Sequence, residues 1–469
     1  MRRSYLTSQK VEQASPTSST KRYGTYGQYE TSAALSSSSS GLGSASLVPR
    51  RTTSYNSTNS DVLSSRASRI SLGEDSSTSA SSGEQEVRAR DKLASSSSPF
   101  PATAGQLGLR NLGNTCYFNS TLQCLFATAP LSAYILDGEY RTDLVRSSIR
   151  SSSQLGSQSI VEAYVSLLKE FWGQDSNAST HSVIAHSRTS SAPLDPSRVK
   201  RILDVKSPRF RGYAQQDSHD ALKALLEHIH EEIQKVKVKP KYQEMKDLAH
   251  QSLPEVADLW WNYARSWNNS EIYDIFGGQY YSAVTCNKCG NVSRAFDIFL
   301  DVNMALPSTS RCTLEDCWRN FTKKDEIDSY HCEKCKKKRK ATKSVAIYRW
   351  PSVLVLQLMR FKFGSSSGGM MRSLASSSAS RISTSVTFPL KSLSLAKFGV
   401  GDHGCPTYDL YAVSCHLGST LGSGHYTSYA CHAGSGRWYH FNDTHVSPVS
   451  EPPSSGSEPY VLFYRARTS

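Results

Sequence analysis

Apolar residues recur at helical spacing in four stretches between about residue 105 and residue 275. The clearest is GNTCYFNSTLQCLF, 113–126, where they form one stripe of a helix that begins near Cys116. The same spacing predicts three further helices, at 161–172, 212–233 and 253–267. Asp217 or Ser218 is the expected cap of the long helix within 212–233.

From Gln279 onward the pattern changes to alternation with a period of two. Short runs rich in β-branched and aromatic residues predict strands, among them QYYSAVTC, VSRAFDIFLDVNMAL, SVLVLQLMRFKF, YDLYAVSCHLG and PYVLFYR. Polar stretches at 145–159, 176–191 and 364–380 are expected to be loops. Helices followed by strands indicate the α+β class.

The first 100 residues contain 29 Ser, only 13 of Leu, Ile, Val and Phe, and no Trp. Such a segment buries too little apolar surface to offset the conformational entropy of the chain. We therefore expect residues 1–104 to be a disordered Ser-rich extension, and residues 105–469 to hold the folded domain.

Charge and cysteine content narrow the possible partners. The formal charge is +14, and a basic cluster, KKKRK, stands at 336–340. No nucleic-acid module surrounds the cluster, so we expect a solvated basic loop and no nucleic-acid partner. No apolar run reaches the roughly 18 residues of a membrane span, so we expect no membrane partner and a cytoplasmic location, with the nucleus as the alternative. Eleven cysteines in a reducing compartment favour thiols, ligands or nucleophiles over disulfides.

Cys116 stands at the start of a predicted helix, directly after Gly-Asn-Thr. Core packing is one interpretation of such a thiol, and it suits Cys124 in the same helix. For Cys116 the other interpretation is a nucleophile, because the positive end of the helix dipole favours thiolate. A nucleophilic cysteine also needs a base and a group that orients the base.

Both partners occur near the C-terminal end of the sequence. His425 follows the glycine-rich stretch GSTLGSG and opens a predicted strand, and the next strand ends at Asn442 and Asp443. A hairpin would place either side chain beside the imidazole and hold the tautomer that accepts a proton from Cys116. A structural turn histidine is the alternative for His425. Four other histidines lack this combination: His416, His432, His440 and His445.

Two CxxC pairs predict a metal site that is separate from the thiol chemistry. Four thiolates close a tetrahedral zinc site and leave no open position for catalysis, so one structural Zn²⁺ per chain is expected. The sequence gap between the pairs exceeds that of a compact zinc ribbon, which indicates two hairpins meeting at a fingertip. The expected ligands are Cys286, Cys289, Cys332 and Cys335.

Several motifs resemble the ubiquitin-specific protease family of papain-like cysteine peptidases, in the same order along the chain. They are GLRNLGNTCYFNSTLQCLF, GYAQQDSHDALKALL, the two CxxC pairs, VLVLQLMRF, VTFPL, GHYTSYA, WYHFNDTHV and YVLFYR, over about residues 106–466. The resemblance implies a right hand with a helical thumb, at about 105–275, and a β-rich palm with zinc-binding fingers, at about 276–469. It also implies ubiquitin and ubiquitinated proteins as partners.

The resemblance assigns roles residue by residue. Cys116 matches the nucleophile, His425 the general base and Asn442 the third triad member, with Asp443 next to it. Asn111 matches a side chain that stabilises the oxyanion, a role suited to an amide donor. The residues that match substrate contacts are Gln216, Asp217, Gly424 and Tyr426, and the 418–424 and 364–385 loops match those that border the channel for the tail of ubiquitin.

Two departures from the family pattern leave questions open. Asn442 is neutral where many relatives have Asp, so either Asn442 or Asp443 could orient His425. The sequence after Asp217 reads SHDALKAL where an acidic or amide residue and a bulky apolar pair are commoner.

Three functions from different classes fit these features. The leading hypothesis is a thiol isopeptidase that releases ubiquitin through an acyl-enzyme on Cys116. The alternatives are a ubiquitin-binding scaffold without catalysis, which the intact Cys116, His425 and Asn442 disfavour, and a zinc-dependent nucleic-acid binder.

Overall fold

The computed structural model describes residues 99–148, 159–174, 192–245, 251–362, 380–401 and 404–467. The chain divides into two compact units, Met1–Ser96 and Ser97–Ser469, and all that follows concerns the second. Residues 1–98 of the Ser-rich extension, whose disorder was predicted, lie outside the described residues, as do nearly all of the three polar loops expected from the sequence. The domain boundary at residue 105 stays a prediction.

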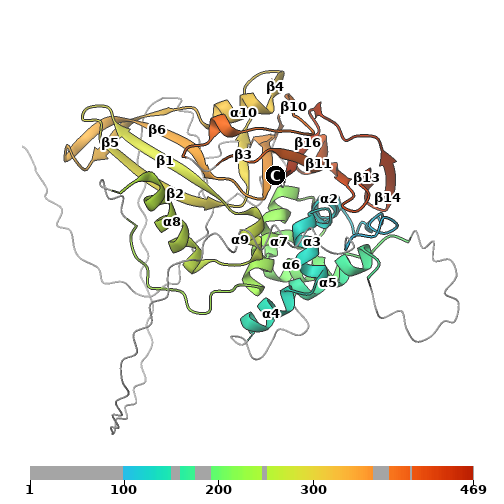
Figure 1. Ribbon diagram of the computed structural model, residues 1–469. Coiled ribbons are helices and arrows are strands. Elements are labelled where there is room, and N and C mark those ends of the chain that lie inside the picture. The colour runs from blue at the N-terminus through green and yellow to red at the C-terminus, as the bar shows by residue number, and fades with distance from the viewer. Residues whose placement is uncertain are drawn as a thin grey trace, which may run out of the picture. The chain divides into compact units, whose positions relative to one another are not determined.

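The N-terminal part of this unit is helical and forms the thumb (Figure 1). The four predicted helices are present as α2 (Cys116–Phe126), α5 (Ile160–Phe171), α7 (Ser218–Glu232) and α8 (Leu253–Trp267). Helices that the sequence analysis did not predict are α3 (Ala129–Leu136), α4 (Tyr140–Ser148), α6 (Ser197–Lys206), the 3₁₀ turn η2 (Pro208–Phe210) and α9 (Glu271–Phe276).

Helix α2 is buried on all sides, including the residues outside its predicted apolar stripe. Every residue from Cys116 to Phe126 is buried, because α2 packs between α7 and the strands β11 (Tyr408–Thr420) and β12 (Ser423–Cys431). Several of its polar side chains therefore have partners inside the protein. Ser120 Oγ lies 3.2 Å from Ser414 Oγ, and Gln123 Nε2 donates to the carbonyl of Leu107 at 2.9 Å.

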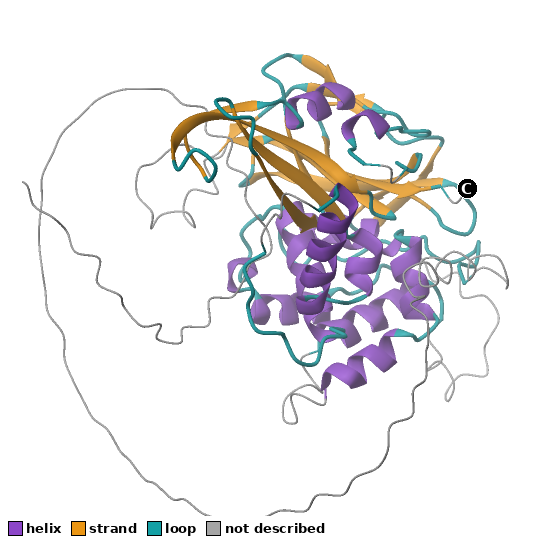
Figure 2. Cartoon of the chain, turned by 60° about the vertical axis from the view of Figure 1, so that its left-hand side comes forward, coloured by secondary structure: helices purple, strands orange, loops and turns teal. Residues whose placement is uncertain are grey.

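The strands form a palm sheet and a finger sheet above the helices (Figure 2). The finger sheet has the order β2-β1-β6-β5. Its strands are β1 (Gly278–Cys286), β2 (Val292–Phe299), β5 (Asp325–Cys332) and β6 (Lys337–Arg349), all paired antiparallel. The run VSRAFDIFLDVNMAL is split, since β2 ends at Phe299 and the chain enters the palm sheet as β3 (Val302–Ala305).

The palm sheet has nine strands, with the main order β14-β13-β12-β11-β16-β7-β3. Besides β3, its strands are β7 (Val353–Met359), β8 (Phe361–Lys362), β9 (Ser380–Arg381), β11 (Tyr408–Thr420), β12 (Ser423–Cys431), β13 (Trp438–Asn442), β14 (His445–Val449) and β16 (Pro459–Ala466). A small third sheet joins β4 (Arg311–Thr313), β10 (Ser385–Thr387) and β15 (Ser455–Gly456) beside helix α10 (Leu314–Phe321), with the 3₁₀ turn η4 (Ala396–Phe398) nearby in sequence.

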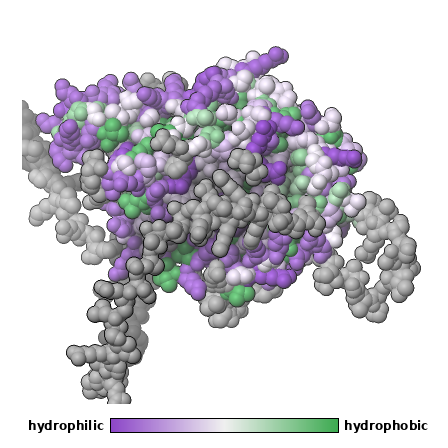
Figure 3. Space-filling view, in the orientation of Figure 1, coloured by the Kyte–Doolittle hydropathy of each residue, from purple (hydrophilic) through white to green (hydrophobic). Residues whose placement is uncertain are grey.

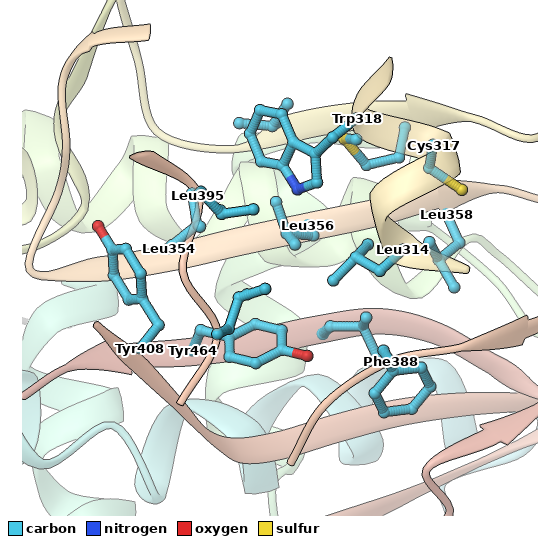
Figure 4. Packing of buried hydrophobic residues seen from close by; sticks show 14 of the residues in the cluster. Leu314, Cys317, Trp318, Leu354, Leu356, Leu358, Phe388, Leu395, Tyr408 and Tyr464 are labelled. Carbon is cyan, nitrogen blue, oxygen red and sulfur yellow. The ribbon is translucent and has the colours of Figure 1, made fainter. Parts of the chain in front are cut away.

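The palm is held by a large apolar cluster between α10 and the palm sheet (Figure 4). Trp318 of α10 is fully buried and packs over the strand that carries Leu354 and Leu356. Burial of each such side chain contributes on the order of 2 kcal/mol. This core fixes the palm sheet, one strand of which carries His425.

The finger end is polar by contrast (Figure 3). Its exposed lysines include Lys288, Lys334, Lys336, Lys337, Lys338 and Lys340. The KKKRK cluster was expected to be a loop, but Lys337 already begins β6, because this segment pairs with β5. No helix in the described part of the chain combines the length and the apolar content that crossing a membrane requires.

Candidate active site

Cys116 is the first residue of α2 and is 2% exposed. The turn before it is left-handed at Gly113 and Asn114, with φ of 100° and 54°, which glycine and asparagine adopt at little cost. Thr115 is the N-cap by position, but its side chain caps no helix N–H and instead accepts from the backbone N–H of Leu112 at 2.8 Å. This loop aims the Cys116 thiol at the palm.

His425 lies near the start of β12, where it faces Leu417 of β11 across the antiparallel pair. The preceding turn requires glycine at two positions. Gly418 has a φ of 139°, and a Cβ on Gly424 would lie 2.5 Å from both the His416 ring and the carbonyl oxygen of Leu417. The glycine-rich stretch therefore permits the tight approach that presents His425.

The structure brings Cys116, His425 and Asn442 together. His425 Nε2 lies 2.6 Å from Asn442 Oδ1 and donates to it in the tautomer that this contact favours. The other ring nitrogen, Nδ1, is then left for the thiol. A hydrogen bond to Cys116 raises the pKa of His425 to about 9, against the opposing effect of burial and with help from Asn442. The imidazole of His425 therefore tends to keep its proton beside the Cys116 thiol.

Asp443 has a different set of partners. Its carboxylate accepts from Asn111 Nδ2 and from Asn119 Nδ2, each at 2.8 Å. Its carbonyl accepts from the N–H of Leu109 at 2.8 Å, and its φ is 49°. The left-handed turn thus points Asp443 away from His425 and toward Asn111. The sequence left open which of these two residues orients His425. In the structure Asn442 contacts the imidazole, and Asp443 holds the side-chain amide of Asn111.

Asn111 is fixed in one orientation by these contacts. Its Oδ1 accepts from the backbone N–H groups of Gly113 and Thr115, at 3.0 and 3.1 Å. One Nδ2 hydrogen is used by Asp443, and the second remains for another acceptor. We call the set Asn111, Cys116, His425, Asn442 and Asp443 the catalytic corner.

The four other histidines named in the sequence analysis have other surroundings. His416 is fully buried beneath β12, and His432 contacts the carbonyl of Ala104 at 2.7 Å. His440 stacks on Tyr429, and His445 is exposed. His425 is thus the member of this group that meets Cys116.

Three of the four residues expected to contact substrate, Gln216, Asp217 and Gly424, lie where the thumb meets the palm. Asp217 caps α7 and accepts from Tyr460 Oη at 2.6 Å, and burial together with Asp220 raises its pKa. Gln216 beside it is half-buried. Across from them, the carbonyl of Gly424 accepts from Gln215 Nε2 at 2.5 Å. This contact links the thumb to the palm beside the catalytic corner.

Tyr426 is placed differently from the expectation. Its side chain is 1% exposed and packs against the rings of His416 and Tyr460. It points inward because residues alternate sides along β12, and His425 takes the side that faces Cys116. The Tyr426 ring thus packs within the palm, and the expected contact of this residue with substrate stays a prediction.

Sequence reasoning missed Asn119, Gln215 and Tyr460. Asn119 lies about one helical turn after Cys116, a spacing that places both on one face of α2. That spacing could have identified it. Gln215 and Tyr460 carry no such local signal, because their partners are 209 and 243 residues away.

Four cysteines gather at the end of the finger sheet, and we call this cluster the fingertip. The Sγ atoms of Cys286, Cys289, Cys332 and Cys335 all lie within 4.8 Å of one another, and those of Cys289 and Cys332 are 3.6 Å apart. Tetrahedral ligands at a Zn–S distance of about 2.3 Å lie roughly 3.8 Å apart. The cluster can therefore bind a metal ion.

The two CxxC turns that build the fingertip have the same form. The N–H of Gly290 donates to the carbonyl of Cys286, and the N–H of Lys336 to that of Cys332, at 2.9 and 2.8 Å. Gly290 and Lys336 both have positive φ, 68° and 52°. The β1–β2 and β5–β6 hairpins thus present matching pairs of sulfur atoms.

A buried cysteine, histidine and amide between a helical layer and a β-sheet layer form the arrangement of a papain-like cysteine peptidase. The family model described as "Ubiquitin carboxyl-terminal hydrolase" matches residues 107–464. The chain belongs to this family, the ubiquitin-specific proteases, and the resemblance inferred from the motifs is confirmed.

Curated relatives agree with this assignment. The chain is 36% identical over 365 residues to "Ubiquitin carboxyl-terminal hydrolase 2" of Homo sapiens, covering 77% of this chain and 55% of that protein. It is 33% identical over 387 residues to "Ubiquitin carboxyl-terminal hydrolase 21" of Homo sapiens, covering 77% of this chain and 62% of that protein. The match thus spans a little over half the length of these relatives.

The fold also resembles a solved structure, that of the SAGA Ubp8/Sgf11/Sus1/Sgf73 DUB module bound to ubiquitin aldehyde. The TM-score is 0.56 at 22% identity, over 78% of this chain and 70% of that chain. At this identity the match concerns the fold, and it confirms the α+β thumb, palm and finger architecture.

Proposed function

We propose that the protein is a deubiquitinase that hydrolyses the bond after the C-terminal glycine of ubiquitin. The observation that carries the proposal is the hydrogen-bonded Cys116–His425–Asn442 series on a ubiquitin-specific protease fold. Ubiquitin attached to proteins, or to other ubiquitin molecules in chains, is the proposed substrate.

In the first step the Cys116 thiolate attacks the carbonyl carbon of the terminal glycine. The negative charge that develops on the oxygen is stabilised by the second Nδ2 hydrogen of Asn111 and by N–H groups at the start of α2, which have no acceptor within the helix. The His425 imidazolium gives its proton to the departing lysine amine, and a thioester on Cys116 remains.

In the second step water attacks the thioester. Neutral His425 accepts a proton from the water, the bond to Cys116 breaks, and ubiquitin leaves with a free carboxylate. Asn442 keeps the imidazole oriented through both steps, and Asp443 keeps Asn111 in place. Asp217 is proposed to meet the basic tail of ubiquitin.

We further propose that the fingertip binds one structural Zn²⁺. The set of four cysteines has the donor chemistry and spacing that zinc prefers. A closed site of this kind would stabilise the finger hairpins and take no part in the chemistry at Cys116. The cytoplasmic location expected from the sequence stays a prediction that cell fractionation would test.

An electrophilic ubiquitin probe tests the proposed activity. Wild-type protein should gain the mass of one ubiquitin on incubation with ubiquitin that carries a C-terminal propargylamide, and peptide mapping should find the adduct on Cys116. Cys116→Ala should abolish both the adduct and turnover of a ubiquitin–fluorophore substrate. Cys124→Ala, a buried cysteine on the same helix, is the matched control and should still react. A wild-type chain that neither reacts nor turns over would refute the proposal.

A further inference from the structure

A buried histidine–aspartate pair joins the first turn of α7 to the chain between β2 and β3. His219 Nε2 lies 2.5 Å from Asp301 Oδ2, and the two side chains are 4% and 7% exposed. Burial alone would raise the pKa of Asp301, yet this pKa lies below its usual value because His219 pairs with it. Pairs of this kind are costly to bury and are weak evidence for stability alone, so the contact calls for another explanation.

Asp301 occupies the junction between the two large sheets. The chain leaves the finger sheet at Phe299, the end of β2, and enters the palm sheet at Val302, the start of β3. The Asp301 carbonyl also accepts from Tyr280 Oη of β1, at 3.3 Å. His219 therefore ties the thumb to the point where fingers and palm meet.

The other side of His219 faces the proposed substrate contact. Its backbone N–H donates to Asp217 Oδ1 at 2.8 Å. The second carboxylate oxygen of Asp217 accepts from Tyr460 Oη on β16, and Tyr460 in turn accepts from Gln357 Nε2 at 2.6 Å. Asp217 is thus held between the palm and the turn that His219 anchors.

We propose that the His219–Asp301 pair is a positioning device, which fixes the first turn of α7 and thereby sets where the Asp217 carboxylate meets the tail of ubiquitin. The inference rests on the proposed function, since Asp217 has this task only in a ubiquitin-binding enzyme. Neither side chain of the pair belongs to the catalytic corner. Its loss should therefore weaken substrate binding and leave the chemical step intact.

The turn has a second anchor that should preserve folding when the pair is removed. Thr121 Oγ1 of α2 donates to the carbonyl of Ser218 at 2.9 Å. Loss of the pair is thus expected to shift the turn without unfolding α7. Substitutions at His219 are suitable probes for this reason.

Steady-state kinetics with a ubiquitin–fluorophore substrate test the proposal. His219→Ala should raise KM about tenfold, with kcat within about twofold of wild type. His219→Gln should restore most of the affinity, because a glutamine amide of similar reach can donate to Asp301. Titration with the electrophilic ubiquitin probe gives the fraction of active enzyme, so misfolded protein does not distort kcat.

The matched control is His230→Ala on the same helix. His230 is also buried, and its Nδ1 lies 2.7 Å from Ser270 Oγ, far along α7 from Asp217. This variant should lower Tm and leave KM unchanged. Equal increases of KM in His230→Ala and His219→Ala would show a general loss of packing and overturn the proposal.

A double-mutant cycle tests whether His219 acts through Asp217. Asp217→Asn should itself raise KM. Adding His219→Ala to it should raise KM little further, because both changes weaken the same contact, that between Asp217 and the tail of ubiquitin. If the increases of KM in the two single variants multiply in the double variant, the proposal is overturned. It is also overturned if KM of His219→Gln is as high as that of His219→Ala. If wild type turns over the substrate and His219→Ala keeps its KM, this inference alone fails. If wild type does not turn over, the proposed function fails with it.

Discussion

At the catalytic corner, Cys116, His425 and Asn442 lie on α2, β12 and β13, where helix α2 packs against the palm sheet. At the fingertip, four cysteines lie on two hairpin turns, and the neighbouring strand β5 is exposed along most of its length. Both packing and several hydrogen bonds hold the side chains of the catalytic corner in place. The geometry of the fingertip depends on its four sulfur atoms and on what they bind.

The difference teaches where each region should be vulnerable. A change at the catalytic corner should alter chemistry and leave the fold in place, because the surrounding core remains. A change at the fingertip should loosen the fingers and leave the chemistry in place, because the cysteines lie on the finger hairpins and Cys116 lies on α2 beneath the palm. The predictions below test this separation, beginning with the largest expected effect.

Asp443 and Asn111 should behave as one unit within the catalytic corner. Asp443→Ala and Asn111→Ala should each lower kcat about a hundredfold, since each removes an ordered oxyanion donor. The double variant should be little worse than either one, because Asp443 acts through the Asn111 amide. Measured kcat values in a double-mutant cycle check this.

Asn442 supplies the contrast for that cycle. Asn442→Ala removes the acceptor of His425 and leaves Asn111 in place. Its effect on kcat should therefore multiply with that of Asn111→Ala. The opposite result would be that the loss of kcat in Asp443→Ala multiplies with that in Asn111→Ala, while the loss in Asn442→Ala does not. Asp443 would then orient His425, and Asn442 would hold the Asn111 amide.

The pH dependence should reveal the thiolate–imidazolium pair. The pKa of His425 is raised to about 9 from an ordinary value of 6.5, chiefly by Cys116. The stabilisation that protonated His425 contributes is thus fully present below about 6.5 and is lost as the pH rises through about 9. Activity should fall about tenfold per pH unit above 9.

Imidazole titration by NMR gives a direct check. In Cys116→Ala the pKa of His425 should fall well below 9, because the main cause of the increase is gone. The Cys124→Ala control should keep it. An unchanged His425 pKa in Cys116→Ala would contradict the pairing.

Metal loss should affect binding more than chemistry. Cys335→Ser removes one of the four sulfur atoms, so the finger hairpins should lose order and KM for ubiquitin substrates should rise about tenfold, with kcat nearly unchanged. Native mass spectrometry should find one zinc per chain in wild type and less in the variant. Cys405→Ser, a half-buried palm cysteine, should change neither value. Active wild-type protein without zinc would refute the metal site.

The two regions also differ in how far the sequence predicts them. The fingertip follows from two CxxC pairs, and α2, α5, α7 and α8 follow from their apolar spacing, because these signals are local. The partners of Asp443 could not be predicted, since Asn111 and Asn119 lie 332 and 324 residues earlier. Helix α3 was missed because its sequence, APLSAYIL, is apolar nearly throughout and shows no period. The burial of α2 outside its apolar stripe could not be predicted either, because the strands that cover it are distant in sequence.

The smallest expected effect comes from the N-terminus. Deletion of residues 1–98 should leave kcat/KM within about twofold of wild type, because the segment is too polar to share the core. Residues just before the predicted boundary at residue 105, however, already contact the folded domain. Phe100 is 8% exposed, and its ring centre lies 4.7 Å from that of Trp172.

Deletion of residues 1–104 should therefore differ from deletion of residues 1–98. It removes Phe100 and the carbonyl of Ala104 that His432 contacts, so it leaves Trp172 partly uncovered. Tm should fall by about 2 to 6 °C in the longer deletion alone. Phe100→Ala in the protein that lacks residues 1–98 should reproduce most of that decrease, whereas Ala102→Gly at an exposed position should not. Equal Tm values for the two deletions would place the start of the folded domain at residue 105.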